Sequence, residues 1–106
     1  MSKSWKASEL AIARLLGGER VPINGRVRGS APDVLHDWLA IEVKSLKNLP
    51  ARMVDAMDQA EKSAAWSKRK EGKDKLPIAI IHHDRQSHLN DLLVMRLGDF
   101  IEHFGT

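Results

Sequence analysis

The segment from Trp38 to Ser45 most constrains the fold, because it is rich in β-compatible residues and apolar and charged residues alternate over 41–44. Ile41 and Val43 alternate with Glu42 and Lys44. Side chains two residues apart on a strand point to the same face of a sheet, so this spacing predicts a strand with one apolar and one charged face. The charged face would carry a carboxylate beside an ammonium group.

Residues 33–35 come shortly before this strand, and a turn near residues 36–37 would make the two segments a β-hairpin. A two-residue turn would place Asp33 diagonal to Glu42, at roughly 7–8 Å. A four-residue turn would place the two residues directly opposite each other. Both turns keep the two carboxylates on one face, whereas a three-residue turn would separate them.

Apolar spacing and capping residues predict the remaining elements. A helix is expected from about Ser4 to Leu16, where Gly17-Gly18 follows, and a second helix from Pro50 to about Lys70. The apolar run 76–81 predicts a strand covered on both faces in the middle of a sheet. A further strand over 92–97 and a short helix over about 99–104 complete the chain.

This order of elements predicts the α/β class. The expected architecture is an α/β/α sandwich with a central mixed sheet, in which helices flank the faces of the sheet. The length of 106 residues, of which 42% are hydrophobic, supports one core, so we expect one domain over residues 1–106.

Asp33, Glu42 and Lys44 form the candidate catalytic group. Two carboxylates on neighbouring strands repel each other unless a cation lies between them, and hard oxygen ligands suit Mg²⁺. Lys44 would stabilise charge on a phosphate or orient the attacking water. The competing interpretation is a solvated strand face with a surface ion pair, but a strand interior to the sheet makes unpaired charge costly.

Pro32-Asp33, followed nine residues after the aspartate by Glu42-Val43-Lys44, resembles the PD-(D/E)XK nuclease superfamily, in particular its phage and archaeal Holliday-junction-resolvase-like members. The resemblance covers most of the chain, because a helix precedes the hairpin and a second helix and further strands follow it. It implies the αβββαβ core of restriction endonucleases. It also implies phosphodiester hydrolysis that depends on Mg²⁺, for which Mn²⁺ would substitute.

The family often places an acidic residue on the first helix and a glutamine on the helix after the lysine. Glu9 and Gln59 occupy those positions, so the resemblance adds Glu9 to Asp33 and Glu42 as a metal ligand and Gln59 to the catalytic residues. Glu9 also shares the apolar stripe of its helix, where a carboxylate needs a partner. The alternatives are a salt bridge of Glu9 with Lys6 or Arg14, and an exposed Gln59 without a catalytic role.

Seventeen Lys and Arg against fourteen Asp and Glu give a net charge of +3, which favours approach to DNA. Cationic residues in expected loops near the site would contact phosphate, and we assign this role to Arg26, Arg28, Lys47 and Arg85. Branched DNA such as a Holliday junction is the favoured substrate. The alternatives are a nicking, flap or duplex endonuclease of the same fold, or a catalytically silent DNA-binding module.

Three histidines gather at the end of a predicted strand but lack the spacing of a structural zinc site: His82, His83 and His88. We interpret them as surface or phosphate-facing residues. The apolar residues Phe100 and Phe104 on the last predicted helix suggest a homodimer interface, as in the resolvase-like proteins, which act as dimers because two symmetric cuts need two sites.

The chain contains no cysteine, so a thiolate metal site and a disulfide framework are excluded. No apolar stretch approaches the ~20 residues that a membrane-spanning helix needs, and the N-terminal residues do not resemble a signal peptide. We therefore expect a cytoplasmic protein, in the host cell if the protein is viral.

Overall fold

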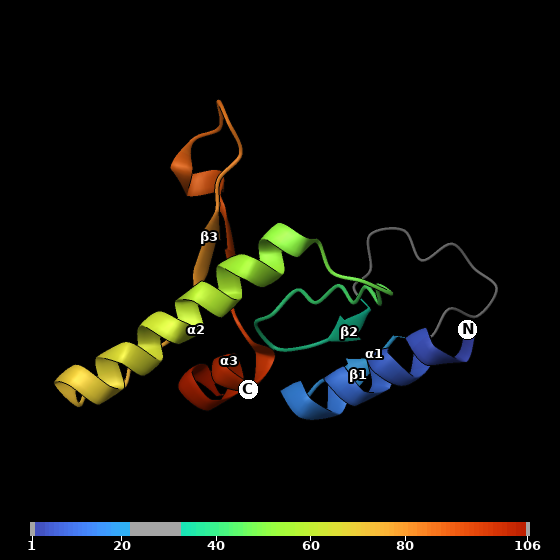
Figure 1. Cartoon of the computed structure of the whole chain (residues 1–106). Helices are drawn as coiled ribbons and strands as arrows, with labels where there is room; N and C mark the ends of the chain where they lie inside the picture. The colour runs from blue at the N-terminus through green and yellow to red at the C-terminus, as the bar shows by residue number, and fades with distance from the viewer. Residues whose placement is uncertain (1, 22–32, 106) are drawn as a thin grey trace. The chain divides into compact units, whose positions relative to one another are not determined.

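The computed structural model describes residues 2–21 and 33–105 (Figure 1). Its helices and strands are α1 (Ser2–Leu16), β1 (Glu19–Arg20), β2 (Val34–Leu35), α2 (Ala51–Glu71), β3 (Ala79–Ile81), the 3₁₀ helix η1 (His88–Asn90), β4 (Leu92–Val94) and α3 (Leu97–Phe104). The chain divides into two compact units, a first unit of Met1–Lys47 with Phe104–Thr106 and a second unit of Asn48–His103.

Helices and strands are mixed, as the sequence predicts for an α/β protein. The strands within the described residues form two separate two-stranded sheets, β1–β2 and β3–β4, and both sheets are antiparallel. The sequence analysis expected these strands to contribute to one central mixed sheet. None of the helices in residues 2–21 and 33–105 is long and apolar enough to span a membrane.

In the first unit, α1 packs on β1 and β2 through one face. Glu9, Ala13 and Leu16 are buried and lie at helical spacing, so they define this face. The helix ends as predicted, because Gly17 adopts the left-handed conformation with a φ of 72°. The N–H of Gly18 then donates to the Ala13 carbonyl at 2.8 Å.

The hairpin of the first unit has the register of a four-residue turn. Val34 pairs with Arg20 of β1 on one side and forms an isolated antiparallel bridge with Ile41 on the other. This bridge leaves residues 35–40 between its two partners, and continuing its register by one residue toward the turn gives a turn of residues 36–39. The predicted strand 38–45 is wrong in extent, since Ile41 is its one residue with a bridge.

In the second unit, α2 runs over nearly the predicted range. Pro50 lies at its N-cap position and Gly72, with a φ of 67°, is its C-cap. The N–H of Gly72 donates to the Lys68 carbonyl at 3.1 Å, which closes the last turn. Met57 and Ser67 are the buried residues of this helix.

The β3–β4 hairpin packs on α2 through β3. Ala79 is buried, whereas Ile80 and its cross-strand partner Leu93 are 55% and 56% exposed. The prediction of a strand covered on both faces over residues 76–81 is therefore wrong, because the apolar run contributes a two-stranded sheet with one exposed face. A loop that contains η1 connects the two strands at the far end of the hairpin (Figure 1).

Candidate functional site

Asp33 joins three segments of the first unit. Its N–H donates to the Ile41 carbonyl at 3.1 Å, and its carbonyl accepts from the N–H of Val21 at 2.9 Å. Its side chain is part of the same network, because Oδ2 accepts from the N–H of Val43 at 2.5 Å. Only 2% of Asp33 is exposed, so the carboxylate is held in a fixed position.

The Asp33 carboxylate also explains why the predicted strand is interrupted. The N–H of Val43 bonds to a side-chain oxygen, and this bond takes the place of a backbone bond in the ladder. Residues 42–45 therefore lie outside the regular strands. The register of the Val34–Ile41 bridge is that of the four-residue turn, but it does not continue to a pair of Asp33 with Glu42, because the N–H of Asp33 donates to the Ile41 carbonyl.

Glu42 and Lys44 flank Val43 and are both exposed. The structure thus joins Asp33 to the Glu-x-Lys segment through the residue between its two charged positions. The sequence predicted that these two charged residues lie on a strand in the interior of the sheet. Instead they are exposed, because the strand pairing ends at Ile41.

Glu9 is a buried carboxylate with a cationic partner. It is 5% exposed, and its Oε1 accepts from Nε of Arg20 at 2.9 Å. Arg20 pairs with Val34 in the β1–β2 sheet, so this ion pair ties α1 to the sheet. The sequence predicted either a metal ion or a salt bridge with Lys6 or Arg14 of the same helix, and it did not predict Arg20, because a partner from β1 depends on how the helix packs.

The other predicted site residues are distributed over the chain. Lys47 is an exposed residue of the first unit. Gln59 is exposed on α2 and Arg85 is exposed in the β3–β4 loop, both in the second unit. Arg26 and Arg28 lie outside the described residues.

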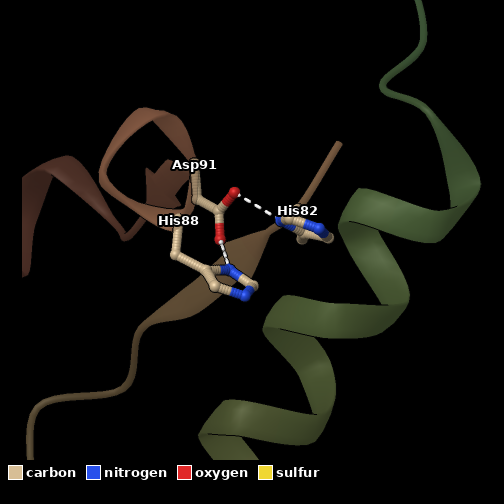
Figure 2. Close-up of side chains that lie close together, drawn as sticks. All are labelled: His82, His88 and Asp91. Carbon is tan, nitrogen blue, oxygen red and sulfur yellow. Dashed lines mark hydrogen bonds and ion pairs between the residues drawn. The ribbon is translucent and has the colours of Figure 1, made fainter. Parts of the chain in front are cut away.

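A second group of polar side chains lies at the end of the β3–β4 hairpin. Nδ1 of His82 is 2.7 Å from Oδ1 of Asp91, and Nδ1 of His88 is 3.0 Å from Oδ2. The Asp91 carboxylate therefore bridges the two Nδ1 atoms, while the two imidazole rings lie against each other with centroids 4.3 Å apart (Figure 2). The hydrogen bond from His88, followed by that from His82, lowers the pKa of Asp91 below its ordinary value.

Two local features bring these three residues together. The β3–β4 register pairs Ile81 with Leu92, and continuing it by one residue places His82 opposite Asp91. The turn of η1 places His88 three residues before Asp91, on the same side of a 3₁₀ helix. His82, His88 and Asp91 offer ligand atoms within 4.8 Å of one another, so they form a group that could hold a metal ion.

Asp91 was not among the residues predicted from the sequence, where the three histidines alone lacked the spacing of a structural zinc site. The sequence did contain a signal for this contact. If the two predicted apolar strands pair, the polar residues that adjoin them lie opposite each other. His83 is not a member of the group. The interpretation of His82 and His88 as surface residues is confirmed, since both are exposed, and the structure adds that Asp91 joins them.

No protein-family model, curated protein or solved structure matches this chain. Two groups of residues in the chain offer chemistry. One is a carboxylate-rich group around Asp33, and the other is a mixed imidazole and carboxylate group around Asp91.

Proposed function

We propose that this protein is a Mg²⁺-dependent DNA endonuclease of the PD-(D/E)XK type that cuts branched DNA. The observation that carries the proposal is the hydrogen bond from the N–H of Val43 to the Asp33 carboxylate, which links the two parts of the motif. Carboxylates that ligate metals are themselves usually hydrogen-bonded, because a second contact fixes their orientation. Asp33 has this kind of support, and Glu42 and Lys44 directly flank the donor residue.

The donor set fits Mg²⁺. Asp33 and Glu42 offer carboxylate oxygens, which are the ligands that this hard cation prefers, and the cation keeps several water ligands. When bound, Mg²⁺ would activate a water molecule and neutralise charge on the phosphate. Because Arg20 binds Glu9, this proposal assigns Glu9 to holding α1 on the sheet and leaves the metal to Asp33 and Glu42.

In the proposed reaction, the oxygen of a water molecule forms a bond to phosphorus as one ester P–O bond breaks. The leaving oxygen takes up a proton, so that one strand end carries a phosphate and the other a hydroxyl group. Asp33 and Glu42 orient the water and the scissile phosphate. Lys44 donates hydrogen bonds to a phosphate oxygen on which negative charge grows.

The finer predictions of the sequence analysis belong to the same proposal. The β1–β2 and β3–β4 sheets would be parts of one mixed sheet in an α/β/α sandwich. Gln59 would assist the site, and phosphate contacts would come from Arg26, Arg28, Lys47 and Arg85. The active form would be a homodimer, because the resolution of a junction needs two symmetric cuts.

Cleavage of labelled four-way junction, flap and linear duplex DNA tests this function. We expect paired symmetric cuts in the junction with Mg²⁺ and none with EDTA. Lys44→Ala should lower the cleavage rate about 100-fold or more, as expected for the loss of a group that stabilises transition-state charge. Glu42→Gln should do the same, and since both residues are exposed, neither variant should disturb the fold.

Lys73→Ala is the matched control, because it removes the same charge from an exposed residue after α2 to which no role is assigned. Equal loss of cleavage in Lys44→Ala and Lys73→Ala would mean that Lys44 acts only through the net charge of the protein. If the wild-type protein binds the junction without cutting it, and Lys44→Ala binds equally well, the catalytic proposal fails. A silent DNA-binding module would then be the better account.

A further inference from the structure

We propose that His82, His88 and Asp91 form a binding site for a divalent transition-metal ion, with Zn²⁺ as the ion that fits best. The site lies at the end of the β3–β4 hairpin in the second unit. It is a different site from the proposed Mg²⁺ centre of the first unit and does not depend on it.

The distances are close to those of a metal site. Zn²⁺ binds nitrogen and oxygen ligands at about 2.0–2.2 Å, which in a tetrahedral arrangement places neighbouring ligand atoms about 3.3–3.5 Å apart. The two Nδ1 atoms are 2.7 and 3.0 Å from the Asp91 oxygens. Small rotations of the side chains would therefore open enough space for an ion in place of the hydrogen-bonded protons.

The backbone holds the three residues in place before an ion binds. His82 directly follows β3, and Asp91 directly precedes β4 in the paired register. Ser87 caps η1 by accepting from the N–H of Leu89 at 3.3 Å, and the N–H of Asp91 donates to the His88 carbonyl at 3.1 Å. These bonds fix the spacing of His88 and Asp91, so little conformational entropy is lost when the ion is bound.

The exposure of the three side chains suits a site that an ion can reach. The Asp91 side chain is 7% exposed, while those of His82 and His88 are 37% and 83% exposed. The carboxylate is thus shielded from bulk water and the imidazoles line the way in. A desolvated carboxylate gains more from a divalent cation than an exposed one does, because water screens the attraction less.

The chemistry of the ligands selects the metal. Two imidazole nitrogens with one carboxylate oxygen suit Zn²⁺ and related transition ions, whereas Mg²⁺ and Ca²⁺ prefer oxygen ligands alone. Three protein ligands leave a position for water or a substrate group. Binding would also join the two ends of the loop 83–90, whose turn includes Arg85 in the left-handed conformation at a φ of 67°.

Titration calorimetry of the EDTA-treated full chain with ZnCl₂ in excess Mg²⁺ tests the proposal. We expect one equivalent of Zn²⁺ to bind to the wild-type protein. His88→Ala should weaken binding at least about tenfold, since even the loss of a residue that only supports a metal ligand has an effect of about this size. The high exposure of His88 means that this variant should keep its fold.

His83→Ala is the matched control, because it removes a neighbouring exposed histidine that is outside the group. Its Zn²⁺ affinity should equal that of the wild-type protein. Co²⁺ provides a second readout, since binding to the group should produce visible absorption bands of low-coordinate Co²⁺ in the wild-type protein and in His83→Ala but not in His88→Ala. Hydrogen exchange should slow in residues 83–90 when Zn²⁺ is added.

Three results would overturn the proposal. If the wild-type protein binds no Zn²⁺ in excess Mg²⁺, the group is a plain hydrogen-bonded pair of histidines on one aspartate. Equal Zn²⁺ affinity of His88→Ala and His83→Ala would locate binding elsewhere among the five histidines of the chain. Zn²⁺ binding that leaves hydrogen exchange in the loop unchanged would contradict the geometry. None of these results bears on Mg²⁺-dependent cleavage.

Discussion

The ion pair between Glu9 and Arg20 gives a prediction about how the first unit is held together. The Glu9 and Arg20 side chains are 7% and 21% exposed, so the pair is largely shielded from water. A hydrogen bond to a charged group contributes about 1.5–3 kcal/mol. Because Arg20 retains about a fifth of its exposure, we expect a coupling free energy near the lower end, about 1.5–2 kcal/mol.

A double-mutant cycle with Glu9→Gln, Arg20→Gln and the double variant measures this coupling. The free energy of unfolding comes from urea denaturation followed by tryptophan fluorescence. In a Trp66→Phe background the remaining tryptophans, Trp5 and Trp38, both belong to the first unit. The fluorescence signal then reports on the unit that contains the ion pair.

The exposed pair of Glu71 and Lys75 in the second unit serves as the control cycle, followed through Trp66 in a background with Trp5→Phe and Trp38→Phe. For this pair we expect about 0.5 kcal/mol or less. A coupling below about 0.5 kcal/mol between Glu9 and Arg20 would refute the reasoning, since surface pairs reach that value. If Mg²⁺ instead stabilises the wild-type protein but not Glu9→Gln, the metal-ligand role predicted from the sequence would regain support.

Three further predictions follow from the packing and the charges. Gly18→Ala should destabilise the first unit by about 1–3 kcal/mol in urea denaturation, because the new Cβ would overlap the Leu35 carbonyl oxygen and come 2.8 Å from Cγ1 of Val34. An unchanged unfolding midpoint would contradict this close approach. Met57→Ala should lower the free energy of unfolding by about 2 kcal/mol or more in the same assay, because Met57 is buried. Leu89→Ala, at a 96% exposed position, should change it by about 0.5 kcal/mol or less. Equal effects of the two variants would argue against the assigned core. The hydrogen bond from Arg96 lowers the pKa of Glu61 below its ordinary value of 4.5. Thermal melts should therefore show Glu61→Gln as less stable than the wild-type protein at pH 7, and this difference in stability should fade as the pH falls below about 4.5. A stability difference that grows in acid would have the wrong sign.

Local sequence signals predicted the helices well. Apolar spacing together with Gly17 and Pro50 gave the ends of α1 and the start of α2 to within about two residues, as is usual for helix boundaries. Helix ends depend on neighbouring residues only, so a short stretch of the sequence is enough to predict them. The apolar runs that form β3 and β4 were found for the same reason.

The extent and partners of the strands were harder to predict. Turns of two and four residues after Leu35 both satisfy the apolar pattern, and the Val34–Ile41 bridge selects the longer one. The sequence also gave no sign that the Asp33 side chain would take the N–H of Val43 and end the ladder. Such alternatives differ by single hydrogen bonds, which local propensity does not rank.

The sequence by itself determined the helices, the apolar strand segments and the residue types available for chemistry, because these follow from local spacing and composition. The tertiary structure decided which charged groups meet. Arg20 reaches Glu9 because α1 packs on β1, and Asp91 reaches His82 because two strands pair across a loop. These contacts join residues of different elements, 11 and 9 positions apart, so they form only when folding has compensated for the entropy of closing the loops between them.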